Sequence, residues 1–285
     1  MDMVDTKNIL VNFTTTYSST NLTTSAVWQF GTLEACMFIF SFISGLSTHS
    51  YIIWLIIKGT RSKIASEFFN LNLSVCEIIL SVNSLFTLSI KWFPNLTTLV
   101  QLLFGNGITG RPLFQCLMCV ERYLAVVHPV TFLKFKPLRY RVICSTTIWI
   151  VNFGSCLFCM FTFLSLTIYI YVWFYLLQFI LFFSIQLFCL LAVLRALKQP
   201  RPGERGREEE NNMKRRAFYI ILITTVSMII TYVPHTITGV LVVVTQQSIQ
   251  VLWSISFICY MLGSFIQTVL YLQHQTRKLS CLCSL

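Results

Sequence analysis

Four charged side chains stand inside the long apolar segments of this chain, where they could hold an ion, move a proton or lock helices together. They are Glu77, Arg111, Glu121 and Arg122, whereas the other charged residues of these segments stand within the first or last few positions. A charged group in a bilayer is costly, so it normally pairs with an opposite charge or faces a water-filled cavity, and it marks a functional site. Which of these roles fits depends on the helices that position the four residues.

Membrane-spanning helices are the elements predicted to position them. Of the 285 residues, 55% are hydrophobic and only 11% are charged, whereas a soluble domain carries about 25% charged residues. A segment of about 20 apolar residues can cross the hydrocarbon. Seven such segments are predicted, which together form one membrane domain at 33–273: they lie at 33–57, 66–90, 96–127, 141–164, 172–197, 216–243 and 251–273. A count of six stays open, because no charged residue separates the fourth segment from the fifth.

The basic residues predict the orientation of this all-α bundle. Lys7 and Lys91 fall on one side, one arginine lies within a segment, and the other basic residues fall on the opposite side. Because basic loops stay in the cytoplasm, residues 1–32 are expected outside, and the third loop 198–215 and the tail 274–285 inside. This arrangement needs an odd number of segments, which favours seven. The net charge of +11 is scattered over short loops, which does not favour nucleic-acid binding.

Several residues outside the segments are predicted to be modified. Asn12, Asn21 and Asn95 each begin an Asn-Xaa-Thr sequence on the side expected to be extracellular, so they are predicted glycosylation sites. Cys281 and Cys283 follow basic residues near the end of the last segment and are candidates for palmitoylation. Two unmodified thiols are the alternative at that position.

The triplet Glu121-Arg122-Tyr123 ends the third segment and is followed closely by His128 and Pro129. An arginine at the end of a membrane helix can simply extend its charge to the interface. That reading explains one residue, and not the whole motif. The motif resembles the signature of the rhodopsin-like (class A) G-protein-coupled receptors, and the seven segments follow one another in the order of that family.

This resemblance implies roles for residues at the cytoplasmic end. Arg122 would contact a heterotrimeric G protein when the sixth segment moves outward, and it would pair with Glu121 at rest. Phe132 in the following loop would pack against the G protein, and Tyr271 would complete the coupling site from the seventh segment. Lys214 stands near where many relatives carry an acid that latches the third-segment arginine, so that latch is absent.

The resemblance also bears on the buried charges. Glu77 stands where the family has an Asp that binds a sodium ion, and Arg111 lies about 16 Å from Arg122 along the helix, at a depth similar to that of Glu77. We predict that the Arg111 guanidinium replaces the ion and pairs with Glu77. His49 and Gln267, expected at the same depth, would complete the hydrogen bonds. Two separate charges that face water-filled crevices are the alternative.

The sixth segment contains Tyr232, Pro234 and His235. Pro234 removes a backbone donor and predicts a kink that acts as a hinge, or an ordinary kink without further role. The resemblance places Tyr232 where a switch Trp is usual and turns His235 toward the ligand cavity, as a ligand contact or as a structurally satisfied side chain. Phe104 stands about where amine receptors carry an Asp, and Glu34 is the one carboxylate expected in the outer half. A small, non-aminergic ligand is therefore implied.

The chain also departs from the family pattern. No Cys occurs near Thr97 or in the second outer loop, so the usual disulfide cannot form. Pro112 lies directly after an arginine and close to Gly107 and Gly110, which predicts a bend in the third segment.

We therefore expect a multi-pass receptor at the plasma membrane, with an extracellular ligand and a heterotrimeric G protein as partners and with no cofactor. No phosphate loop, zinc-protease motif or nucleophile elbow indicates an enzyme. Two other functions stay open. One is a non-signalling chaperone or dimer partner of another receptor, and the other is a polytopic transporter or channel that uses the buried charges in an ion path.

Overall fold

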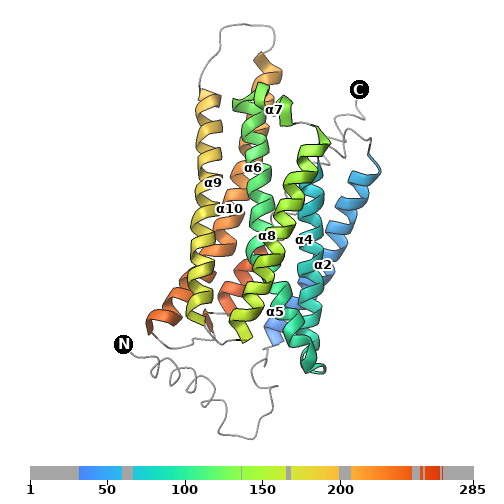
Figure 1. The fold of residues 1–285 in the computed structure, drawn as a ribbon, viewed down its shortest axis with the longest axis vertical. Coiled ribbons are helices and arrows are strands. Elements are labelled where there is room, and N and C mark those ends of the chain that lie inside the picture. The colour runs from blue at the N-terminus through green and yellow to red at the C-terminus, as the bar shows by residue number, and fades with distance from the viewer. Residues whose placement is uncertain are drawn as a thin grey trace, which may run out of the picture.

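The computed structural model describes residues 32–59, 67–135, 137–164, 168–198, 207–245, 251–252, 254–263 and 265. These residues are helical apart from short turns, and no strand occurs among them. Figure 1 shows the helices side by side as one bundle. An all-helical bundle is one of the two ways to satisfy every backbone polar group inside a bilayer.

Seven helical segments follow one another within the described residues. Five helices are each long and apolar enough to cross a membrane, namely α2 (Thr32–Ile57), α4 (Phe68–Ser89), α8 (Leu138–Leu164), α9 (Ile168–Lys198) and α10 (Arg207–Thr245). The third segment is α5 (Thr97–Gly105), η3 (Asn106–Gly110) and α6 (Arg111–Val127) in succession. The seventh includes a short apolar helix, Ser254–Gly263. Short helices η2 (Pro94–Leu96) and α7 (Pro129–Phe135) lie between longer ones.

The separation of α8 from α9 decides the count of segments. The two are distinct helices that run in opposite directions (Figure 1), so the six-segment alternative is wrong. The predicted bounds of the first five segments agree with the helices to within a few residues. The sixth begins earlier, because α10 starts at Arg207, inside the loop predicted at 198–215. Three glutamates follow Arg207 in the sequence, and acidic residues stabilise the first turn of a helix.

The two ends of the bundle differ in charge. Helices α2, α6 and α9 all terminate at one end of the bundle, which we call the Arg122 end. We call the opposite end of the bundle the Glu34 end. In Figure 1, α7 lies at the Arg122 end, at the top of the picture. The described basic residues near the helix ends gather at the Arg122 end, whereas Lys91 lies at the Glu34 end, as helix directions require. Asn95 is exposed at the Glu34 end.

Buried polar side chains lie in the interior beside clusters of apolar ones, and apolar side chains also cover the outside. Arg111, Gln115 and Gln186 are at most 1% exposed, whereas Phe161 and Ile150 are among the exposed hydrophobic residues. This distribution suits a lipid environment, where packing and interhelical hydrogen bonds hold helices together in place of an apolar core shielded from water.

The third segment is irregular where a bend was predicted. A π-helical stretch, η3, separates α5 from α6 and ends directly before Arg111 and Pro112. Pro112 has no N–H to donate to the carbonyl of Ile108, so a regular α-helix cannot pass this point unchanged. Single π-turns of this kind are frequent at functional sites.

A close helix crossing holds this irregular stretch against α8. A Cβ atom on Gly105 would lie 2.6 Å from the Cα of Cys156 and 3.2 Å from the carbonyl oxygen of Ser155. Only glycine fits there, because the obstacle is backbone and cannot rotate away. By contrast, a Cβ on Gly154 of α8 would meet nothing within 4 Å.

We expect Gly105→Ala to destabilise the protein, since α5 and α8 must separate to admit the methyl group, at a cost of about 1–3 kcal/mol. Thermal unfolding of the purified protein in detergent measures this as a lower midpoint. Gly154→Ala is the matched control and should not lower the midpoint. Equal unfolding midpoints for the two variants would contradict the close contact between Gly105 and the backbone of α8.

Candidate functional site

The centre of the bundle holds a buried ion pair. Nε of Arg111, the first residue of α6, lies 2.8 Å from Oε1 of Glu77 in α4, and the two side chains are 1% and 7% exposed. The expected pair is thus present. His49 in α2 is buried and lies within electrostatic range of both charges. Gln267, the fourth residue expected here, lies outside the described residues.

An aromatic ring also contacts the guanidinium. The guanidinium carbon of Arg111 lies 5.3 Å from the ring centre of Tyr260, in the seventh segment. A cation over an aromatic face is attracted by the ring quadrupole, most strongly where water is absent. Arg111 therefore links the third segment to α4 through charge and to the seventh through the ring. Tyr260 was not predicted from the sequence, where it stands out only as a tyrosine within an apolar stretch.

Side chains of the π-turn η3 form hydrogen bonds with the neighbouring helices α4, α8 and α9. Asn106 donates to the carbonyl of Cys76 over 3.1 Å, and Asn152 of α8 donates to Oδ1 of Asn106 over 2.9 Å. Thr109 donates to Oε1 of Gln178 over 2.8 Å. A polar network of this kind fixes a backbone that departs from the α-helix. None of these residues was singled out in the sequence, although Asn106 and Asn152 interrupt apolar runs.

The sixth segment contacts the same π-turn. The hydroxyl of Tyr232 donates to the carbonyl oxygen of Gly107 over 2.7 Å. Tyr232 is buried and lies two residues before Pro234, the proline inside α10. The residue expected to act as a switch therefore joins the predicted hinge of α10 to the irregular part of the third segment, one turn before Arg111.

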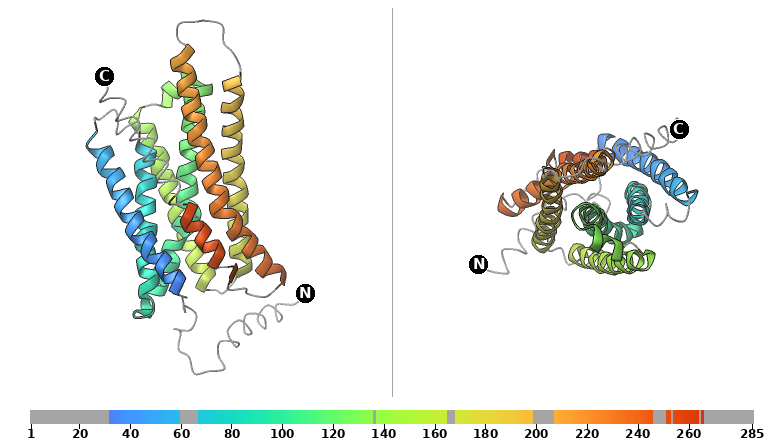
Figure 2. Two further views of the ribbon diagram at one scale, coloured as in Figure 1. Left: turned by 180° about the vertical axis from the view of Figure 1, so that it is seen from behind. Right: turned by 90° about the horizontal axis from the view of Figure 1, so that it is seen from above.

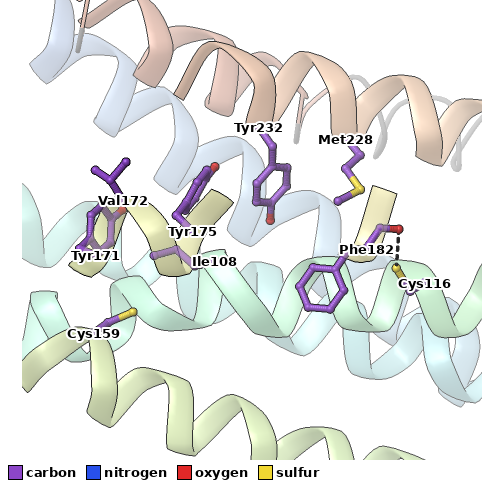
Figure 3. Close-up of a cluster of buried hydrophobic side chains, with 9 residues drawn as sticks. All are labelled: Ile108, Cys116, Cys159, Tyr171, Val172, Tyr175, Phe182, Met228 and Tyr232. Carbon is purple, nitrogen blue, oxygen red and sulfur yellow. Dashed lines mark hydrogen bonds between the residues drawn. The ribbon is translucent and has the colours of Figure 1, made fainter. Parts of the chain in front are cut away.

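An aromatic stack extends from Tyr232 toward the Glu34 end. The ring of Tyr175 stacks on Tyr232 with centroids 5.6 Å apart and contacts the His235 ring at 4.7 Å. Figure 3 shows these two tyrosine rings side by side between α9 and α10. His235 also lies 3.3 Å from the hydroxyl of Tyr171 and 6.5 Å, between ring centres, from Phe104. Phe104 and His235 are thus brought together as expected.

A small pocket lies beside this stack. Its enclosed space is about the size of one water molecule, and its lining is Tyr171, Val172, Tyr175, His235, Thr236 and Gly239. No acidic side chain belongs to this lining. Glu34 lies elsewhere, because its carboxylate accepts a hydrogen bond from Ser254 at the start of the last described helix. Figure 2 shows that helix beside α10.

The Arg122 end differs from the expected arrangement in one respect. Glu121 forms its ion pair with Arg141 of α8, and not with the adjacent Arg122. Within the described part of the chain, Arg122 forms no ion pair. Tyr123 is held by His128, whose Nε2 lies 3.1 Å from the tyrosine hydroxyl. The motif residues are therefore in place, but the acid is bound to a different arginine.

The loop after the motif forms the short helix α7. Phe132 is half-buried there, whereas Val130 and Leu133 are 70% and 61% exposed. The more exposed apolar surface thus belongs to residues that the sequence did not single out. Tyr271 lies outside the described residues, as do the predicted modification sites in both terminal regions. No group of three or more His, Cys, Asp or Glu side chains that could hold a metal occurs where the structure is described.

Comparison with known protein families identifies the family of this chain. The model of the 7 transmembrane receptor (rhodopsin family) matches residues 48–271. The chain belongs to this family. It is therefore a multi-pass membrane receptor and not an enzyme, and the seven-helix bundle is the fold of that family.

Curated relatives of the receptor are similar to it at low identity. Chemokine XC receptor 1 of Homo sapiens is 24% identical over 200 residues, which cover 63% of this chain and 59% of the relative. Somatostatin receptor type 5 of Bos taurus is 28% identical over 111 residues, 37% of this chain and 30% of the relative. Somatostatin-like receptor F_48D10.1 of Takifugu rubripes is 26% identical over 127 residues, 42% and 44% of the two chains.

We expect the buried pair to show strong coupling in a double-mutant cycle. Arg111→Ala and Glu77→Ala each strand a buried charge, which costs about 3–5 kcal/mol, so each should sharply lower surface expression of the receptor. The double variant should recover part of this loss, because no charge is left unpaired. Flow cytometry of an N-terminally tagged receptor measures the surface expression of each variant. Additive losses without rescue would show that the two residues act separately.

Proposed function

We propose that the receptor binds a ligand at the Glu34 end and activates a heterotrimeric G protein at the Arg122 end. The presence of Arg122 at the end of α6, with Glu121 held by Arg141, is the observation that supports coupling most directly. The Arg122 end, where the basic residues gather, would face the cytoplasm, and the receptor would reside in the plasma membrane. Glycosylation of Asn12, Asn21 and Asn95, palmitoylation near the C-terminus and a receptor dimer belong to the same proposal.

A continuous set of contacts connects the pocket with the proline hinge of α10, and the movement of α10 would carry the signal on to the Arg122 end. A ligand that widened the small pocket and entered it would touch Tyr175 and His235, and Tyr175 stacks on Tyr232. Tyr232 in turn binds the backbone of Gly107 and lies beside the proline hinge of α10. A ligand that binds better when the Tyr232 contact is rearranged would shift α10 about Pro234, because differential affinity for two states moves their populations.

The pocket favours a small, non-aminergic ligand. No carboxylate lines it, so an amine would lose its hydration without gaining a counter-charge. The Tyr175 hydroxyl is buried, and no described residue accepts its hydrogen bond. A neutral, largely apolar ligand that carries one hydrogen-bond acceptor would satisfy this hydroxyl while its remaining surface packs against the aromatic rings.

A chemokine or a somatostatin-like ligand is the second candidate. The names of the relatives favour it, since those proteins are described as chemokine and somatostatin receptors. Such a ligand would contact the Glu34 end more widely than the small pocket allows. A non-signalling dimer partner and a transporter remain the alternatives in other functional classes, and they differ from both receptor readings in showing no nucleotide exchange.

We also propose that Arg111 takes the place of an ion beside Glu77. The 2.8 Å pair leaves the carboxylate with a built-in cation. A sodium ion would have to displace the guanidinium and leave that charge buried, which is costly. The receptor would therefore be insensitive to sodium.

Coupling is tested by a panel of purified heterotrimeric G proteins with the receptor in nanodiscs. We expect one or more G proteins to exchange nucleotide faster with the receptor present, with or without added ligands. Arg122→Ala should reduce this exchange to the level of empty nanodiscs, whereas Arg139→Ala, an exposed arginine of α8, should not. Exchange that survives Arg122→Ala would remove the motif from the mechanism, and flux of solutes in proteoliposomes without exchange would favour a transporter.

Sodium insensitivity is tested by thermal unfolding in sodium chloride and in N-methylglucamine chloride at equal ionic strength. A bound ion stabilises the folded state by an amount that grows with the logarithm of its concentration above its dissociation constant. Because we expect no sodium to bind, the midpoints of the unmodified receptor should agree within about 1 °C. Arg111→Ala frees Glu77 and should make the midpoint rise with sodium, while the variant lacking both side chains should not respond. A sodium-dependent midpoint in the unmodified receptor would refute the replacement.

A further inference from the structure

Arg141 connects three helices at the Arg122 end. Its Nη2 donates to Oε1 of Glu121 in α6, and the two side chains are 5% and 12% exposed. Its guanidinium carbon also lies 5.9 Å from the ring centre of Phe69 in α4. Arg141 itself stands in the first turn of α8. The carboxylate of the motif is thereby held toward α8 by a cation that has little freedom to leave.

Helix geometry explains why the neighbouring arginine does not take this carboxylate. Consecutive residues of an α-helix point about 100° apart, so side chains at i and i+1 do not face each other. Glu121 can reach Arg122 only if both side chains bend around the helix, while Arg141 approaches from the adjacent helix directly. Arg122 nevertheless lies within electrostatic range of Glu121, so the two arginines compete for one acid.

We propose that Arg141 is a positioning residue for coupling: it holds Glu121 on the α8 side and so keeps Arg122 available to the G protein. The inference rests on the proposed function, because coupling through Arg122 gives the pair its consequence. Without Arg141, the largely buried Glu121 charge loses its partner. An unpaired buried charge is costly, and a long flexible arginine one residue away can bend back to it. Arg122 is then drawn onto its own helix and withdrawn from the partner.

Basal nucleotide exchange tests this competition. Arg141→Ala should lower exchange at least about fivefold, the smaller end of typical coupling between sites, and Arg141→Lys should stay near the unmodified receptor because a cation remains. Glu121→Gln combined with Arg141→Ala should restore exchange, since no carboxylate is left to capture Arg122. Arg139→Ala is the matched control, an exposed arginine two residues away on the same helix. The rescue separates positioning from a simple loss of folding.

A second measurement does not depend on coupling. In receptor labelled with ¹⁵N at arginine Nε, the Arg122 signal is identified by its loss in Arg122→Lys. That signal should shift in Arg141→Ala, and it should keep its original position in the double variant with Glu121→Gln and in Arg139→Ala. Nucleotide exchange that does not depend on Arg122 would refute the proposed function. The Arg122 Nε signal would still report whether Arg122 and Arg141 compete for Glu121. An Arg122 signal unchanged by Arg141→Ala overturns the inference, whatever the exchange assay shows.

Discussion

The ion pair between Arg111 and Glu77 is the interaction on which the rest of this receptor depends. A guanidinium at the centre of a bilayer needs a counter-charge or a water-filled cavity, and Arg111 is fully buried beside Glu77, so α4 and the third segment meet at this depth. Tyr260 covers the same guanidinium from the seventh segment. One buried cation thus fixes the relative depth of three segments. Such a pair adds little net stability, but losing either partner is expensive, which makes the contact a strong constraint on the packing.

The π-turn η3 follows from that constraint. Pro112 and the glycines before it permit the third segment to leave α-geometry just where Arg111 enters the interior. The backbone groups and side chains of η3 then become partners for other helices, including the carbonyl of Gly107 for Tyr232. Because Tyr232 binds η3, stacks on Tyr175 of the pocket and lies two residues before the proline of α10, the place that accommodates the charge is also the place where the sixth segment is held.

The two ends of the bundle use charge differently. At the Glu34 end, Glu34 is bound by Ser254 and does not line the pocket, so aromatic rings and hydroxyl groups dominate the cavity. At the Arg122 end, two arginines lie near the single acid of the motif, and Arg141 holds it. The pocket at the Glu34 end is therefore aromatic and carries no acidic side chain, whereas Arg122 at the opposite end forms no ion pair with any described residue.

The sequence by itself predicted the irregular third segment and favoured seven segments and the pairing of Arg111 with Glu77, because hydropathy, proline chemistry and the cost of a buried charge act locally or at a known depth. A count of six and two separate charges stayed open until the structure separated α8 from α9 and placed Nε of Arg111 2.8 Å from Oε1 of Glu77. It could not assign the partner of Glu121, since the adjacent Arg122 is nearer in the chain while Arg141 is nearer in space. It also missed Tyr260, Asn106 and the bond from Tyr232 to Gly107. These contacts were decided by tertiary structure alone, because the rotation and crossing of helices set which faces meet, and apolar helices carry little periodic signal of it.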